Sequence, residues 1–273
     1  MLLITGSDGQ LGTELSELMS DAMAVGKDRL DITDSAAVKD FVKEHGIRLI
    51  VNCAAYTAVD KAEDEVRLAK KINAEGPKNL AQSGAAVIHI STDYVFDGRN
   101  YKPYEPDDAA NPVSVYGKTK LAGESAVLEY ADTALIIRTS WLYSSHGKNF
   151  VRTIRNLGRG RDKIDVVDDQ IGSPTFAGDL AEAIVKIIPQ IRKGQKEIYH
   201  FANEGVCSWY DFAKEIIDIS NIDCKVCPIS SENYKTKASR PFCSVLSKEK
   251  IKREFGLTIP HWKDGLIRCL KRF

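Results

Sequence analysis

The feature that most constrains the fold is a glycine-rich turn that follows a short apolar run at the start of the chain. The run "LLIT" at residues 2–5 is typical of a buried strand. The string "TGSDGQLG" then places Gly6, Gly9 and Gly12 before a segment with helical periodicity at residues 10–19. A strand, a glycine turn and a helix in this order predict a crossover unit, in which the helix carries the chain to a parallel neighbouring strand.

The same glycines predict a phosphate site. They permit a tight turn and a close approach of the backbone to a pyrophosphate, which then faces the N-terminus of the helix. They are spaced three residues apart, which favours a longer turn than the two-then-three spacing of the dehydrogenase fingerprint. An ordinary strand-to-helix turn is the alternative. We favour a dinucleotide site because the turn follows the first strand of a repeating strand–helix pattern.

That pattern extends over the first two thirds of the chain and then loosens. Because each apolar run alternates with a helical segment, we predict an α/β fold with a Rossmann-like doubly wound parallel sheet. We expect residues 1–148 to form the dinucleotide-binding domain, with a return of the chain to it at about 171–203, and residues 149–273 to be mostly a smaller interleaved C-terminal substrate lobe. Strands are predicted near residues 22–26, 47–54, 85–92, 133–140, 163–169, 197–203 and 223–229, and helices at 31–46, 64–84, 113–130, 149–160 and 208–220. We expect Thr33 or Asp34 to cap the helix at 31–46.

Charge and cysteine content narrow the partners. The chain has 38 basic and 38 acidic residues, so no overall positive field predicts nucleic-acid binding, and a small molecule is favoured. No long apolar run predicts a membrane span. Six scattered cysteines and a start without a basic signal region favour the cytoplasm. Cys224 and Cys227 fit half a zinc site or a redox pair, but no second pair accompanies them, and we expect small residues of a strand or loop.

Residues near the second strand bear on the choice between NADP and NAD. Lys27 follows that strand and could meet a 2′-phosphate, which favours NADP. Asp8 favours the opposite, because a carboxylate beside a pyrophosphate repels it unless the side chain turns outward or caps the helix. Asp31 could serve the adenine or its ribose, or could shape the turn before the next helix. The two interpretations of Asp31 stay open.

Small and hydroxyl side chains end two of the later strands. Ala54 is the last residue of the strand at 47–54, and Ala55 follows it. Small residues at this position let the backbone line a cofactor. Ser91 and Thr92 end the strand at 85–92, where a hydroxyl can orient a carbonyl under reduction. Helix-packing alanines and a helix cap or turn are the respective alternatives.

Two tyrosine–lysine pairs share a spacing of four residues, which places both side chains on one helical face. They are Tyr116 with Lys120, and Tyr210 with Lys214. The first pair lies on the helix directly after the Ser-Thr strand end, so we expect Tyr116 to protonate the alkoxide that hydride addition leaves, with its pKa lowered by Lys120. The second pair opens an amphipathic helix of the outer lobe, where we expect a packed aromatic and a solvated lysine.

Ten strings in register make the chain similar to the dTDP-4-dehydrorhamnose reductases, a family of the extended short-chain dehydrogenase/reductases. They are "GQLG", "LDITD", "NCAAYTAVDKAE", "STDYVFDG", "YGKTKLAGE", "RTSWLYS", "GKNFV", "DDQIGSPT", "DLA" and "RPFCSVLS". The resemblance implies reduction of the C4 keto group of dTDP-4-dehydro-L-rhamnose by NADPH or NADH, giving dTDP-L-rhamnose for cell-surface polysaccharide.

The resemblance also implies roles for individual residues. Thr92, Tyr116 and Lys120 are the expected catalytic residues. For Trp141, core packing is the alternative to stacking on a ring, and for Arg240 a surface carboxylate is the alternative to the diphosphate. With Lys27 added, the expected cofactor contacts are Gly6, Asp8, Gly9, Gln10, Leu11, Gly12, Lys27, Asp31, Ile32, Ala54, Ala55, Tyr56, Tyr116 and Lys120. The expected substrate contacts are Val59, Asp93, Tyr94, Trp141 and Asn149, with Gln170 and Arg240 as further ones.

Two alternative functions, a role for a metal ion and the oligomeric state stay open. Another NAD(P)-dependent sugar-nucleotide reductase or epimerase would share these motifs, and so would a non-catalytic NADP-binding regulatory subunit. Some members of the family use Mg²⁺ at a dimer contact in which Glu14 could take part, although one glutamate is no readable metal site. The sequence leaves the oligomeric state open between a monomer and a homodimer.

Overall fold

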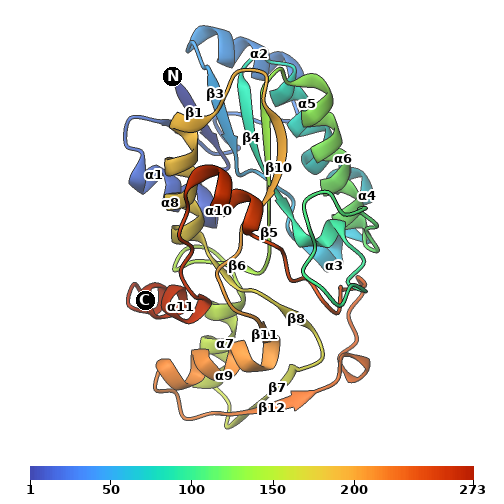
Figure 1. Cartoon of the computed structure of the whole chain (residues 1–273). Coiled ribbons are helices and arrows are strands. Elements are labelled where there is room, and N and C mark those ends of the chain that lie inside the picture. The colour runs from blue at the N-terminus through green and yellow to red at the C-terminus, as the bar shows by residue number, and fades with distance from the viewer.

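The centre of the molecule is a six-stranded sheet in which every strand pairs in parallel with its neighbours. The computed structural model describes all 273 residues, and the sheet fills its upper half in Figure 1. The strand order is β10-β5-β4-β3-β1-β2, so the chain reverses direction across the sheet between β1 and β3. The strands are β1 (Leu2–Thr5), β2 (Met23–Val25), β3 (Leu49–Asn52), β4 (Ala86–Thr92), β5 (Ala134–Thr139) and β10 (Lys196–His200).

Helices cover both faces of this sheet, which is why most residues of its central strands are apolar. Leu3 and Ile4 are adjacent and fully buried, yet they pack in different clusters on opposite faces. One face carries α1 (Gln10–Leu18), α8 (Ala177–Ile187) and α10 (Glu249–Phe255). The other face carries α2 (Ser35–Glu44), α5 (Gly76–Ala81) and α6 (Val115–Tyr130). The doubly wound sheet predicted from the sequence is therefore present.

The helix predicted at residues 64–84 is interrupted. It consists of α4 (Val66–Lys70), a π-helical turn at Lys71–Glu75 and α5. Pro77 is responsible, because it has no N–H to donate to the carbonyl of Asn73. That carbonyl instead lies against Gly123 of α6, where any side chain would collide with it. The interruption thus lets α6 approach closely.

A second group of elements lies below the sheet in Figure 1. Its core is a 15-residue cluster that includes Phe212 and Trp262, both buried. Its elements include α7 (Phe150–Arg159), α9 (Trp209–Ile219), α11 (Trp262–Leu270), and a parallel pair of β7 (Lys163–Val167) with β12 (Lys225–Ile229). The remaining strands are β6 (Leu142–Tyr143), β8 (Ile171–Gly172), β9 (Thr175–Phe176) and β11 (Cys207–Ser208), and the remaining helices are α3 (Val59–Ala62) and short 3₁₀ turns at Asp93–Val95, Ile188–Gln190 and Ser231–Asn233.

Several local predictions can be compared with these elements. Asp34 caps α2 by accepting from the backbone N–H groups of Ala36 and Ala37, so it, and not Thr33, is the N-cap. Cys227 lies within β12, and all six cysteines are free thiols. None of the helices combines the length and apolarity that crossing a membrane requires. The domain boundary at residue 148 stays a prediction.

Candidate active site

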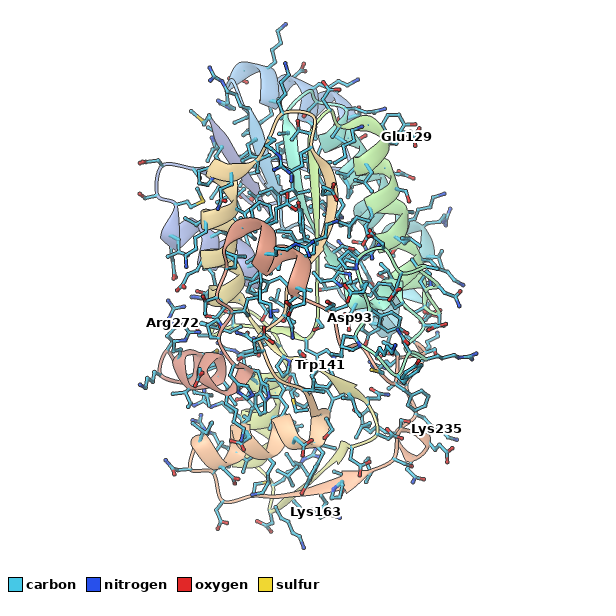
Figure 2. All side chains as sticks on the ribbon, in the orientation of Figure 1. Asp93, Glu129, Trp141, Lys163, Lys235 and Arg272 are labelled. Atoms are coloured by element: carbon cyan, nitrogen blue, oxygen red, sulfur yellow. The ribbon has the colours of Figure 1, made fainter.

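A cavity of about 950 Å³ lies at the carboxyl ends of β1, β3, β4 and β5. Its upper wall comes from the main sheet and its lower wall from α7, α9 and β7. Figure 2 shows Asp93 and Trp141, which both line it, at the level where the sheet meets the lower elements. Since the chain reverses between β1 and β3, the cavity lies at the switch point where open α/β sheets bind ligands.

The glycine loop forms one end of the cavity and fits a pyrophosphate. Gly6 has φ +67°, and a Cβ there would lie 2.6 Å from the backbone nitrogen of Ala54. A Cβ on Gly12 would lie 2.7 Å from the Cα of Ser7, so Gly12 packs the loop and does not line the cavity. No side chain caps α1 and no acidic residue lies in its first turn. Its first N–H groups are therefore free to bind an anion.

The charged residues of this region lie near the end of β2 and in the turn that follows it. The Asp8 carboxylate lies beside Gly26 at the end of β2, because a Cβ on Gly26 would meet its Cγ at 2.9 Å. Asp31 accepts from the backbone N–H and the hydroxyl of Thr33 at 2.9 and 2.7 Å. The hydroxyl bond keeps the pKa of Asp31 below its ordinary value. The structure therefore shows the turn-shaping role of Asp31, while Lys27 is exposed.

Most of the predicted site residues meet in this one cavity, although their roles stay predictions. Those that line it are Gly6, Asp8, Gly9, Gln10, Leu11, Ala54, Ala55, Val59, Thr92, Asp93, Tyr94, Tyr116, Lys120, Trp141, Asn149, Gln170 and Arg240. Those that do not are Gly12, Lys27, Asp31, Ile32 and Tyr56. Ile32 packs on Gly76, and the Tyr56 hydroxyl donates to Glu65 at 2.6 Å.

Tyr116 lies in the first turn of α6, directly below the end of β4. Ser114 starts this helix by accepting from the backbone N–H of Gly117 at 3.1 Å. Burial raises the pKa of Tyr116 to about 12, and the hydrogen bond between its side chain and that of Thr92 acts in the opposite direction. The lowering of this pKa by Lys120 that the spacing predicts is therefore not found, because burial outweighs it. Tyr116 is therefore protonated at neutral pH and able to donate to a bound oxygen.

Lys120 lies one helical turn beyond Tyr116 and is only 2% exposed. Its Nζ donates to the carbonyl of Ile90 at 2.6 Å. Burial lowers the pKa of Lys120 to about 8, and the carboxylate of Glu124 acts in the opposite direction. By contrast, Lys214 is half-exposed and donates to Asp218 at 2.7 and 2.9 Å. The prediction that Lys214 is a solvated surface lysine is confirmed.

A buried ion pair joins α6 to β5. Arg138 donates through Nε to Glu124 at 3.0 and 3.2 Å and through Nη2 at 2.7 Å. Its Nη1 donates to the carbonyl of Pro106 at 3.2 Å. The hydroxyl of Ser91 also donates to Glu124. Ser91 is thereby committed to the ion pair, which leaves Thr92 as the strand-end hydroxyl beside Tyr116.

Asp93 has an unused carboxylate oxygen in this region. The Thr92 hydroxyl donates to its Oδ1 at 3.0 Å, whereas its Oδ2 has no partner of good hydrogen-bond geometry although the residue is only 2% exposed. Burial raises the pKa of Asp93 to about 6. The side chain of Ser244 lies close enough to act on this carboxyl in the opposite direction and lowers its pKa. A buried oxygen without a partner costs free energy, so a ligand hydroxyl that donated to it would be bound favourably.

The lower wall is aromatic. Trp141 stacks on Trp209 with ring centroids 3.5 Å apart and 7° between the planes, and Phe150 contacts Trp209 at 4.5 Å. Trp141 also has φ +48°, which is unusual for a bulky residue. One face of the indole predicted to stack on a ligand ring is thus already covered. The sequence predicts Trp209 only as part of the outer helix, because no sequence pattern links it to Trp141.

Two further predicted contacts are engaged with protein groups. Arg240 donates through Nη1 and Nη2 to Asp60 of α3 at 3.2 and 2.9 Å. The carboxylate alternative is thus present, and a diphosphate contact stays a prediction. Asn149 caps α7 and donates to the Gln10 side chain at 2.9 Å. It thereby joins the lower elements to the helix of the glycine loop.

Glu14 gives no support to a metal site. It is 2% exposed, and its two oxygens accept from the Ser144 hydroxyl and from Arg272, each at 2.6 Å. Arg272 extends from the end of the C-terminal helix in Figure 2. The structure contains no group of three or more His, Cys, Asp or Glu residues that could hold a metal ion.

Comparison with known proteins agrees with this geometry. The model of the family described as RmlD substrate binding domain matches residues 1–273. A dTDP-4-dehydrorhamnose reductase of Streptomyces griseus is 42% identical, with 97% of this chain and 91% of the relative covered. The spore coat polysaccharide biosynthesis protein SpsK of Bacillus subtilis is 39% identical, with 99% and 96% covered. The crystal structure of dTDP-4-dehydrorhamnose reductase from Bacillus anthracis in complex with NADP is 40% identical, with a TM-score of 0.95 and 100% and 99% of the two chains covered.

Proposed function

Because the chain belongs to the family of dTDP-4-dehydrorhamnose reductases, we propose that it reduces the C4 keto group of dTDP-4-dehydro-L-rhamnose with NADPH or NADH. The product, dTDP-L-rhamnose, serves cell-surface polysaccharide synthesis. The observation that carries this proposal is that Tyr116 and Lys120 line the same cavity as the free amides of the glycine loop. Cofactor and sugar would therefore meet beside the proton donor.

The glycine loop and the small residues after β3 fit the cofactor, whose nicotinamide supplies the hydride. Gly6 leaves space that a side chain would fill, and the first turn of α1 offers free N–H groups to the pyrophosphate. Ala54 and Ala55 let the backbone line the nicotinamide side of the cavity.

Tyr116 is the group that completes the reduction. Its hydroxyl gives a proton to the C4 oxygen as negative charge develops there, and the Thr92 hydroxyl orients that oxygen once its proton turns to it from Asp93 Oδ1. Lys120 favours the tyrosinate that remains, because a cation near a phenolate lowers the free energy of the charged form. Thr92 and Lys120 are buried and Tyr116 is half-buried, which limits the access of water to the reacting atoms.

The lower elements supply substrate contacts in this proposal. The free Oδ2 of Asp93 accepts from a sugar hydroxyl, and the aromatic wall around Trp141 contacts the rest of the nucleotide sugar. Residues 149–273 therefore act mostly as a substrate lobe. We place the reaction in the cytoplasm, where both cofactors and sugar nucleotides are made, with the protein as a monomer or homodimer.

The experiment that tests this function is oxidation of NADPH and NADH by the purified protein with dTDP-4-dehydro-L-rhamnose generated in place. Tyr116→Phe should lower kcat by about 10²–10⁴-fold, because the proton donor is lost. Tyr210→Phe is the matched control, since it alters the other tyrosine of identical spacing and should keep full activity. No turnover by the wild type, despite measurable cofactor binding, would refute the substrate assignment.

A further inference from the structure

Behind Lys120 lies a chain of buried polar side chains that the proposed reaction does not use. We propose that His89 is a positioning residue for Lys120: Asn52 fixes its imidazole as the Nε2–H tautomer, and this N–H faces the Lys120 amine. The inference rests on the proposed function of Lys120. It adds a control over when that lysine holds its proton.

The orientation of the Asn52 amide follows from its neighbours. Its Oδ1 accepts from the Thr5 hydroxyl at 2.8 Å and from the backbone N–H of Ala54 at 3.2 Å. The Ala54 N–H can only donate, so the oxygen of the amide must point toward it. The Nδ2 group then points toward His89. Asn52 is fully buried, so water offers no alternative partner.

The tautomer of His89 follows from the orientation of Asn52. The Asn52 Nδ2 group is 2.9 Å from His89 Nδ1 and can only donate, so Nδ1 must be an acceptor. The imidazole is neutral, because burial keeps the pKa of His89 well below its ordinary value and Lys120 acts in the same direction. A neutral imidazole with an acceptor at Nδ1 carries its proton on Nε2.

This assignment decides what Lys120 meets. His89 Nε2 is 3.4 Å from Lys120 Nζ. An ammonium at that position presents N–H against N–H and gains no hydrogen bond from the imidazole. A neutral amine has a lone pair that can accept from Nε2–H. His89 therefore favours the neutral amine, whereas the Ile90 carbonyl, which accepts from Nζ at 2.6 Å, favours the ammonium.

The other groups around Lys120 do not cancel this effect. Glu124 on the same helix favours the ammonium, but it is shared with Arg138 of β5. Cys53, which directly follows β3, is a neutral thiol, because burial raises its pKa to about 12. Tyr116 is also neutral between turnovers. Burial and the imidazole therefore act together against the charge on Lys120.

NMR of the isotope-labelled enzyme tests the proposal without turnover. Long-range ¹⁵N–¹H spectra should show His89 with a protonated Nε2 and an unprotonated Nδ1, and the ¹³Cε shift of Lys120 should give its titration midpoint. Thr5→Val, which leaves the Ala54 contact of Asn52 in place, should change neither. A wild-type His89 found as the Nδ1–H tautomer or as an imidazolium would overturn the proposal, whatever the enzyme reduces.

Asn52→Asp tests the consequence for Lys120. The new carboxylate should accept from Nδ1–H and reverse the tautomer, so that the Nε2 lone pair faces the ammonium. The Lys120 midpoint should rise by at least about one pH unit, a tenfold change in the proton equilibrium, and the basic limb of the kcat profile should move with it. Asn52→Asp with His89→Leu keeps the charge without the imidazole. An equally large rise there would assign the effect to charge and refute the role of His89.

Discussion

Replacement of Arg138 by methionine should lower the free energy of unfolding strongly, because Arg138 belongs to a buried ion pair. Arg138 and Glu124 have side chains only 3% and 2% exposed, and Arg138 donates four hydrogen bonds, three of them to Glu124. Arg138→Met leaves the Glu124 carboxylate buried with only Ser91 as a donor. Breaking a buried pair in this way costs about 3–5 kcal/mol, since the remaining charge has lost its compensation.

Urea unfolding followed by circular dichroism measures this cost. With a slope of roughly 3 kcal/mol per molar for a chain of this size, the midpoint should fall by about 1 M or more. Lys214→Met is the matched control, because it breaks an exposed pair with Asp218 and should leave the midpoint almost unchanged. Arg138→Met combined with Glu124→Leu should recover most of the loss, because no unpaired charge remains. Equal midpoints for Arg138→Met and Lys214→Met would refute the reasoning.

Three other substitutions test separate parts of the site. Gly12→Ala should weaken NADPH binding about tenfold or more in a fluorescence titration, since the added methyl costs about 1–3 kcal/mol against the loop backbone. Gly160→Ala is the control and should bind NADPH normally, because the nearest atom to the added methyl is 3.8 Å away. Burial raises the pKa of Asp93 to about 6, above that of an unfolded aspartate, so the wild type should lose about 3 kcal/mol between pH 4 and pH 7 that Asp93→Asn retains; parallel unfolding curves of the two proteins would contradict this. Asp60→Asn should raise the KM for the sugar nucleotide more than it lowers kcat, because Arg240 and the backbone N–H of Ala238 lose a shared carboxylate; an unchanged KM would show that this anchor does not shape the substrate site.

The elements of the main sheet could be predicted from the sequence because their signals are local. The run "LLIT" is itself the strand β1, and Asp34 caps the helix α2, which begins at the next residue. Tyr116 and Tyr210 have the same spacing to a lysine, and they were separated only by their positions relative to a strand end. The structure places Tyr116 in the cavity and Tyr210 against the lower core.

Contacts between distant segments were beyond the same reasoning. Arg240 has its partner 180 residues away in Asp60, and no pattern selects that carboxylate among 38 acidic residues. Trp141 and Trp209 meet because α9 packs among the lower elements of the molecule, next to the segment that follows β5. The π-helical turn has a local signal in Pro77, although the helical periodicity of residues 64–84 predicts one continuous helix.

The strand order also determines when the sheet can be completed on the ribosome. β10 pairs with the edge of β5, yet more than fifty residues separate the two strands in the sequence. At about 5–20 residues per second of synthesis, the edge of β5 waits for several seconds. An unpaired edge can pair with another chain during that interval. A nascent chain that stalls before residue 200 is therefore the form of this enzyme that most needs a chaperone.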